Sequence, residues 1–166
     1  MHNRTPEFDL CLFGGNGDLA LRKLLPALYY CELDKAFNPI GRIIGIARTG
    51  PSQEEYLAQV HAAIQQHVPE LDYDETVWQQ FAQRIEFIGL DIANRDDYKQ
   101  LAERLNQAPN RVRVYYLATA PSLFTEATQH LHTHGLVNEC SRLVLEKPLG
   151  HDLASSRAIN NHVLNL

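Results

Sequence analysis

The apolar positions of this chain follow two alternating patterns, one typical of buried strands and one typical of amphipathic helices. Short apolar runs between turn-forming residues predict strands of a sheet that is covered on both faces. The predicted strands are Phe8–Phe13, Arg42–Ala47, Ile85–Leu90, Val112–Ala118 and Leu143–Leu145. Apolar residues at helical spacing predict helices between and after them. The predicted helices cover about residues 18–36, 52–68, 74–84, 97–106, 121–134 and 152–164.

Local signals support several of these helix boundaries. Ser52 and Glu55 have the spacing of a capping box, which predicts a helix start. Gly135 follows a helical pattern and is expected to adopt the left-handed conformation that ends a helix. Pro26 lies inside the first helical pattern and is expected to bend it, because proline lacks the backbone donor.

Strands that alternate with helices predict an α/β fold of the Rossmann-like, doubly wound kind. Right-handed crossovers give a mostly parallel sheet with helices on both faces. The expected strand order is 3-2-1-4-5, and a ligand is expected above the carboxyl ends of the strands. We expect residues 1–166 to form one domain, because this length suits a single core.

Composition narrows the classes of partner. The net charge is −5, so a nucleic acid or an anionic membrane is not expected as the main partner. The N-terminal residues lack the apolar core of a signal peptide, and no apolar run approaches a membrane span. The three cysteines are odd in number and lack metal-ligand spacing. We therefore expect a reduced cytoplasmic protein that holds no metal.

The first strand runs into a glycine-rich turn, Gly14-Gly15-Asn16-Gly17-Asp18-Leu19. A turn of this kind presents backbone N–H groups at the start of a helix, where the helix dipole also attracts anions. It therefore predicts a binding site for the pyrophosphate of a dinucleotide. The turn departs from the G-x-G-x-x-G pattern because Leu19 stands at the third glycine position, so the helix is expected to sit slightly differently. The alternative is an ordinary tight turn capped by Asn16 or Asp18.

The end of the second strand bears on the choice of dinucleotide. An acidic residue there accepts from the ribose hydroxyls of NAD and repels the 2′-phosphate of NADP. This chain has Ala47-Arg48-Thr49 instead, and the planar fork of Arg48 suits a phosphate. The sequence therefore predicts NADP, with a solvated surface arginine as the alternative.

The end of the fourth strand is made of small residues, Ala118-Thr119-Ala120-Pro121. They would let a ribose or nicotinamide approach the backbone at Ala118 and Pro121. Helix initiation at Pro121 is the alternative, and the two interpretations are compatible.

Three stretches together resemble one known family. They are Gly14-Gly15-Asn16-Gly17-Asp18-Leu19-Ala20-Leu21-Arg22-Lys23-Leu24-Leu25-Pro26-Ala27-Leu28-Tyr29, Tyr116-Leu117-Ala118-Thr119-Ala120-Pro121-Ser122-Leu123-Phe124 and Arg142-Leu143-Val144-Leu145-Glu146-Lys147-Pro148-Leu149-Gly150. The first resembles the G-x-x-G-D-L-A-x-R-K-L-x-P-A-L-Y signature of glucose-6-phosphate 1-dehydrogenase, and the third its E-K-P-x-G loop. The likeness extends over essentially the whole chain, and it makes the missing third glycine a trait of the family.

The resemblance implies oxidation of glucose 6-phosphate at C1 to 6-phosphogluconolactone, with hydride transfer to NADP. It implies that residues 14–20 hold the pyrophosphate and that Arg48 holds the 2′-phosphate. Lys147 would bind cofactor and substrate, and Lys23 would lie near the sugar phosphate; a plain surface lysine is the alternative for each. Pro148 would shape the loop after Lys147. Full-length family members are homo-oligomeric.

The resemblance also implies that the catalytic histidine lies in the family's α+β domain, beyond this sequence. The R-I-D-H-Y-L-G-K motif of that domain does not occur here, and His151 is not at the position of the base. We therefore expect no catalytic residue in this chain and no turnover by the chain alone. His130 and His134 share a helix face, but no carboxylate or cysteine partner indicates a metal site.

The sequence bears on two other functions. A free-standing NADP-binding redox sensor is the alternative to the dehydrogenase domain. A reductase or epimerase would need a Tyr-x-x-x-Lys pair, and the segments that begin at Tyr30 and Tyr98 lack the lysine.

Overall fold

The computed structural model describes residues 4–146. The predicted last helix, at residues 152–164, lies outside the described residues, as do Lys147, Pro148 and His151. The strands are β1 (Phe8–Phe13), β2 (Gly41–Ala47), β3 (Ile85–Gly89), β4 (Val112–Leu117) and β5 (Ser141–Leu145). The helices are α1 (Leu25–Leu33), α2 (Gln53–His67), α3 (Glu75–Arg84), α4 (Tyr98–Asn106) and α5 (Phe124–Thr133). Every strand and helix predicted within this range is present.

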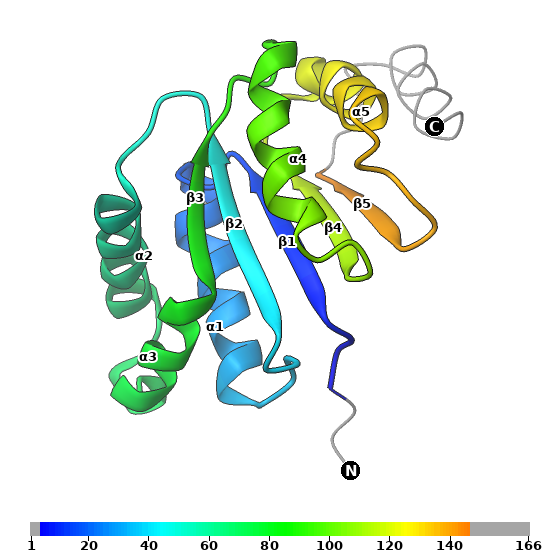
Figure 1. Ribbon diagram of the computed structural model, residues 1–166. Coiled ribbons are helices and arrows are strands. Elements are labelled where there is room, and N and C mark those ends of the chain that lie inside the picture. The colour runs from blue at the N-terminus through cyan, green and yellow to red at the C-terminus, as the bar shows by residue number, and fades with distance from the viewer. Residues whose placement is uncertain (1–3, 147–166) are drawn as a thin grey trace.

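The described strands form one parallel sheet, and its order confirms the prediction. The order is β3-β2-β1-β4-β5, and each neighbouring pair is parallel. All carboxyl ends therefore lie at one edge of the sheet, which points upward in Figure 1. The central strand β1 is buried at every position, which explains its continuous apolar run.

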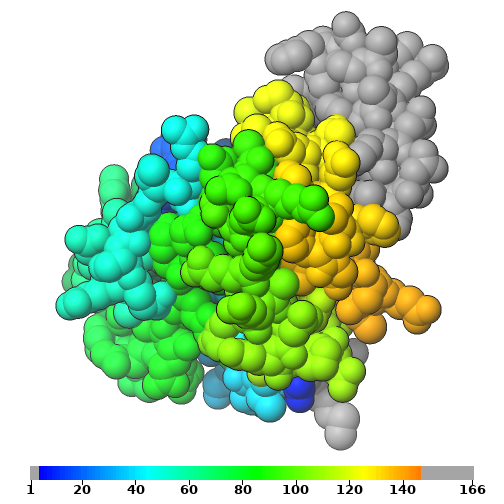
Figure 2. Space-filling view, turned by 45° about the horizontal axis from the view of Figure 1, so that its top comes forward, coloured from blue at the N-terminus to red at the C-terminus, as the bar shows by residue number. Residues whose placement is uncertain are grey.

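Helices cover both faces of the sheet. On one face, α1, α2 and α3 pack on the even-numbered residues of β1, such as Leu10 and Leu12. On the other face, α4 and α5 pack on Cys11 and Phe13. Figure 1 shows α4 in front of the sheet and α1 behind it, and Figure 2 shows α4 and α5 covering the front face.

The first helix differs from the prediction in two respects. Helical backbone begins at Asp18, but residues Ala20–Leu24 form a π-helical turn in which the Leu25 N–H donates to Ala20 O. This wider turn lies directly before Pro26, where a bend was expected. The helix also ends at Leu33, three residues before the predicted end at Ala36. It ends there because Lys35 adopts a left-handed φ of 56° and the Ala36 N–H turns back to Cys31 O at 2.9 Å.

The other local signals are confirmed. Ser52 and Glu55 form the reciprocal hydrogen bonds of a capping box at the start of α2. Gly135 follows α5 with a φ of 67°. Strand β5 begins at Ser141, two residues before the predicted start, because Ser141 already pairs with Arg113 of β4.

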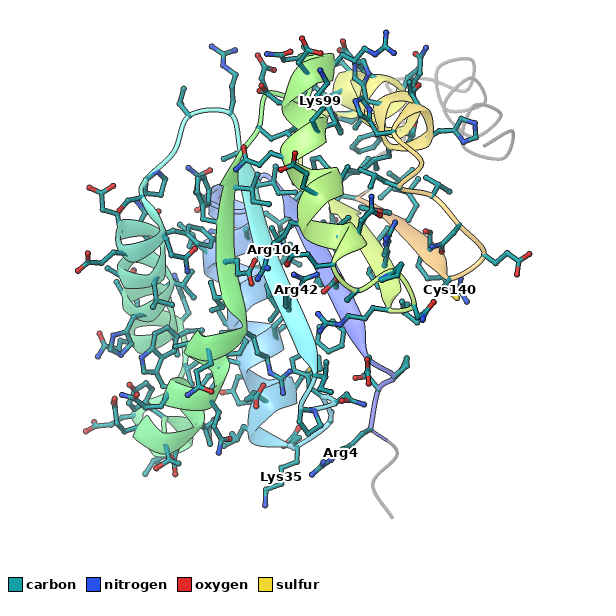
Figure 3. All side chains as sticks on the ribbon, viewed as in Figure 1. Arg4, Lys35, Arg42, Lys99, Arg104 and Cys140 are labelled. Carbon is teal, nitrogen blue, oxygen red and sulfur yellow. The ribbon has the colours of Figure 1, made fainter. Side chains whose placement is uncertain are left out.

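Ion pairs close the amino edge of the sheet. Asp9 is completely buried in β1, and the Arg42 guanidinium donates to both of its carboxylate oxygens at 2.7 Å. Arg111 adds a third contact to Asp9 at 3.0 Å. Arg42 also donates to Arg104 O of α4, and Figure 3 shows these two residues together between the sheet and α4. The charged side chains at this edge are therefore paired with one another and stabilise the packing. The glycine turn and Arg48 lie at the opposite, carboxyl edge of the sheet.

The outer edge of the sheet is partly closed by a side chain. The Gln53 carboxamide donates to Ile85 O at 2.8 Å and accepts from the Phe87 N–H at 2.7 Å. These are the two hydrogen bonds that one residue of a parallel neighbouring strand would make with β3. Gln53 thus stands in for a missing strand at this edge.

Candidate functional site

The glycine turn between β1 and the first helix is held against β2. The N–H groups of Gly14 and Gly15 both donate to Ile46 O, at 2.8 and 3.0 Å. The Gly17 N–H then donates to Gly14 O at 3.0 Å, which closes the turn. The backbone of the turn is therefore anchored to the carboxyl end of the adjacent strand.

Two of the glycines are required by their surroundings. Gly14 has a φ of 83°, and a Cβ at this position would lie only 2.5 Å from Ala118 O at the end of β4. A Cβ on Gly15 would lie 2.7 Å from Gly45 Cα of β2. The turn is thus wedged between the two strands that flank β1, where no side chain fits.

Tyr56 of α2 supports the turn from below. Its buried hydroxyl donates to Gly15 O at 2.8 Å. Burial raises the pKa of this phenol, so it remains a neutral donor. A Cβ on Gly45 would lie 2.3 Å from Tyr56 Oη, so this glycine makes room for the supporting side chain.

The turn lacks the third glycine of the usual pattern, but its backbone still approaches β2 closely. Leu19 is half-buried, and the next residue, Ala20, is completely buried against the sheet. The close backbone approach that a third glycine normally permits occurs instead between Gly15 and Gly45. The expectation that the helix sits differently is consistent with this contact.

The turn leaves backbone donors free at the start of the helix. The Leu21 N–H donates to Gly17 O at 3.0 Å, so Asp18 and Leu19 belong to the first helical turn. The N–H groups of Asn16, Asp18 and Leu19 have no acceptor among residues 4–146. Unpaired donors at the positive end of a helix fit the pyrophosphate of a dinucleotide.

The end of β2 carries a cation and no carboxylate. Ala47 is the last strand residue, and Arg48 and Thr49 after it are exposed. Within the described part of the chain, Arg48 forms no hydrogen bond or ion pair. A free guanidinium at this position fits an anion on the adenosine ribose of a bound dinucleotide.

The end of β4 lies on the other side of the turn. The Ala118 N–H donates to Phe13 O at 2.9 Å, and Pro121 begins a short 3-10 turn that leads into α5. Between them, the Thr119 hydroxyl is buried and has no hydrogen-bond partner among the described residues. Helix initiation at Pro121 is confirmed, and the approach of a ribose or nicotinamide to this segment, which borders the glycine turn, stays a prediction.

Tyr116 and Glu146 meet on the same face of the sheet. Tyr116 belongs to β4 and Glu146 follows β5, and the tyrosine hydroxyl donates to the carboxylate. The sequence pattern did not single out this pair, because the contact depends on the register of β4 with β5. The pairing of Leu117 with Leu145 brings their neighbours Tyr116 and Glu146 close together, and this pairing is known only from the sheet.

Of the predicted site residues, the turn at 14–19, Arg48, Ala118 and Pro121 all lie at the carboxyl edge of the sheet. Lys23 is exposed in the π-helical turn and makes no ion pair with another described residue. Asp18 is also exposed and pairs with Arg22 at 3.2 Å. The structure thus places the predicted cofactor residues that it describes at one edge of the sheet, whereas Lys147 lies outside the described residues and the role of Lys23 stays a prediction.

His130 of α5 and His134, which follows this helix, pack on Tyr98. The rings of His130 and His134 lie 5.0 and 5.6 Å from the ring of Tyr98 in α4. Within residues 4–146, no cluster of three or more His, Cys, Asp or Glu side chains is placed to hold a metal ion. None of the helices formed by these residues is long and apolar enough to cross a membrane.

Comparison with known proteins assigns this arrangement to a family. Residues 11–166 match the family described as glucose-6-phosphate dehydrogenase, NAD binding domain. The chain belongs to this family. It is 41% identical to the glucose-6-phosphate 1-dehydrogenase of Mycolicibacterium smegmatis, with 97% of this chain and 34% of that protein covered. It is 35% identical to the enzyme of Rhizobium meliloti, with 94% and 32% covered.

Solved structures of the family share the fold. Glucose-6-phosphate 1-dehydrogenase from Mycobacterium avium superposes with a TM-score of 0.87 at 30% identity, covering 97% of this chain and 34% of that one. A glucose-6-phosphate dehydrogenase in complex with its substrate glucose 6-phosphate gives 0.85 at 25% identity, covering all of this chain and 35% of that one. The chain spans about a third of the length of the curated relatives it matches. Its domain therefore binds a nicotinamide dinucleotide, as the family does, and the free donors of the turn fit that cofactor.

Proposed function

We propose that this chain binds NADP and serves as the coenzyme domain of an oxidoreductase that acts on glucose 6-phosphate. One observation carries the proposal. Among residues 4–146, three N–H groups of the glycine turn have no acceptor and the Arg48 side chain at the end of β2 has no partner, and the residues next to Arg48 in the chain include no carboxylate. The relatives named as glucose-6-phosphate 1-dehydrogenases support the choice of substrate.

The preference for NADP follows from charge at the end of β2. The 2′-phosphate of NADP is a dianion, and a guanidinium pairs with it through two parallel hydrogen bonds. NAD has a hydroxyl at the same place and is usually recognised by a carboxylate. Arg48 therefore favours the phosphorylated cofactor, and the hydroxyl of Thr49 adds a donor.

In the proposed reaction, the nicotinamide ring supplies the hydride acceptor when the cofactor is bound. The turn at Gly14–Leu19 would hold the pyrophosphate, and the end of β4 would flank the nicotinamide half. Lys147, which follows Glu146 in the sequence, would hydrogen-bond substrate hydroxyls and steer the sugar phosphate. Lys23 is proposed as a further cation near that phosphate.

The proposal also concerns the cellular compartment of the protein. Cys11, Cys31 and Cys140 are free, and burial raises the pKa of the Cys11 thiol. Free cysteines favour a reducing compartment, and we place the protein in the cytoplasm.

Calorimetric titration of NADP and NAD against the purified chain tests the cofactor assignment. Arg48→Ala removes charge-assisted hydrogen bonds of about 1.5–3 kcal/mol, so NADP affinity should fall roughly 10- to 150-fold while NAD affinity stays the same. Arg142→Ala is the matched control, because Arg142 is an exposed arginine near the amino end of β5. Equal affinity for the two cofactors, or the same loss in both variants, contradicts the assignment.

The substrate assignment needs a separate titration. Glucose 6-phosphate is added to the NADP-saturated chain, with glucose as the uncharged control and Lys147→Ala as the variant. Binding of glucose 6-phosphate should exceed that of glucose and should weaken in the variant, because the variant removes a cation. Equal binding of the two sugars contradicts the role of Lys147.

A further inference from the structure

Thr119 carries a buried hydroxyl that is unpaired in the part of the chain that the structure describes. Its Oγ1 has no hydrogen-bond partner among residues 4–146, although the residue as a whole is half-buried. Buried hydroxyl groups are normally paired, as Thr128 shows by donating to Phe124 O at 2.9 Å. The other two such atoms among the described residues are the Nε atoms of Arg111 and Arg113, and both guanidinium groups form hydrogen bonds through other nitrogens at the amino edge. Thr119 is therefore the unpaired group that lies beside the cofactor loops.

The contacts of Thr119 show where a rotation about χ1 would place its hydroxyl. A Cβ on Gly14 would lie 3.4 Å from Thr119 Cγ2, so the methyl group faces the glycine turn. The hydroxyl and the methyl occupy two of the three staggered positions on Cβ. A rotation of χ1 to the next staggered position brings the hydroxyl to the place that the methyl now holds. The donor would then face the space beside the turn.

The turn divides the dinucleotide between two strands. The pyrophosphate would lie over the turn after β1, and the adenosine ribose toward the end of β2. The nicotinamide half would then pass near the end of β4, where Ala118 and Thr119 lie. A hydroxyl in this position would meet ribose and phosphate oxygens of that half, and both accept hydrogen bonds.

We propose that Thr119 is a positioning residue that donates a hydrogen bond to the nicotinamide half of the bound cofactor after rotating its hydroxyl toward the glycine turn. The inference rests on the proposed NADP binding and adds a residue to that site. Without cofactor the hydroxyl has no partner among residues 4–146, and the cofactor would supply one. Removal of this hydroxyl should therefore stabilise the protein without ligand and weaken its binding of NADP.

Thr119→Val tests both sides of this relation, because valine keeps the shape and removes the hydroxyl. Without ligand, the melting temperature of the variant should rise by about 2–4 °C, since an unsatisfied buried group is lost. Its NADP affinity should fall about three- to tenfold, the effect of one hydrogen bond. Thr119→Ser retains the hydroxyl and should bind NADP as the unmodified chain does.

Adenosine 2′,5′-bisphosphate separates this role from a general disturbance of the site, because it lacks the nicotinamide half. Thr119→Val should bind this fragment as tightly as the unmodified chain while binding NADP more weakly. Unchanged NADP affinity, or an equal loss for both ligands, would overturn the role of Thr119 and leave the cofactor assignment intact. Failure of the unmodified chain to bind either ligand would instead overturn the proposed function itself.

Discussion

Gly14 offers a direct test of how the site is built, since alanine at this position is opposed by two separate effects. Its φ of 83° places the residue in the left-handed region, which costs an L-residue about 1–2 kcal/mol. The added Cβ would also lie 2.5 Å from Ala118 O, a backbone atom that cannot rotate away. Relieving such an overlap costs about 1–3 kcal/mol. Together the two effects predict a loss of about 2–5 kcal/mol in the free energy of unfolding.

Two other glycines serve as controls, one with left-handed backbone but no steric overlap and one with neither. Gly135 has a φ of 67° but open space around its Cβ position, so Gly135→Ala should cost only about 1–2 kcal/mol. Gly89 has open space and no left-handed backbone, so Gly89→Ala should be neutral or stabilising by up to about 1 kcal/mol. The difference between the Gly14 and Gly135 variants isolates the contact with β4.

Urea denaturation measures the free energies, and calorimetric titration measures NADP binding. Gly14→Ala pushes the turn away from β4, so NADP affinity should fall about tenfold or more through displaced N–H donors. Neither control variant should change this affinity, because both glycines lie outside the turn. If Gly14→Ala costs no more than Gly135→Ala and binds NADP normally, the wedged turn is not what shapes the site.

Two further predictions concern buried ionisable groups. Burial raises the pKa of several tyrosines above their ordinary value of 10.0, among them Tyr56, Tyr98 and Tyr115. The unfolded chain ionises first, so the free energy of unfolding should fall above pH about 10 by ~1.4 kcal/mol per pH unit for each tyrosine. Tyr98→Phe should reduce this slope by about that amount in urea denaturation at alkaline pH, and an unchanged slope refutes the assignment. Asp9→Asn should cost about 3–5 kcal/mol because the partly buried Arg42 and Arg111 lose the carboxylate of the fully buried Asp9, whereas the exposed Asp18→Asn should cost about 0–1 kcal/mol; equal losses would show that burial is irrelevant.

Much of the fold was predictable because its signals are local. The continuous apolar run of β1 predicted a central strand, and the spacing of Ser52 and Glu55 predicted the start of α2. The glycine turn and Arg48 were found in the same way, since each follows a strand directly. The early end of the first helix at Leu33 was not predictable, because it depends on the left-handed backbone of Lys35.

The sequence by itself determined the order of strands and helices and the absence of an acid at the end of β2, and it predicted the edge of the sheet at which the cofactor should bind. These follow from periodicity and from residues adjacent in the chain. Only the tertiary structure decided which distant groups meet: Gly15 with Gly45, Tyr116 with Glu146, and Gln53 with the edge of β3. Such contacts depend on strand register and on distances of a few ångströms, which side-chain periodicity does not specify. For the same reason, only the folded chain shows that the hydroxyl of Thr119 lacks a partner within the part that the structure describes.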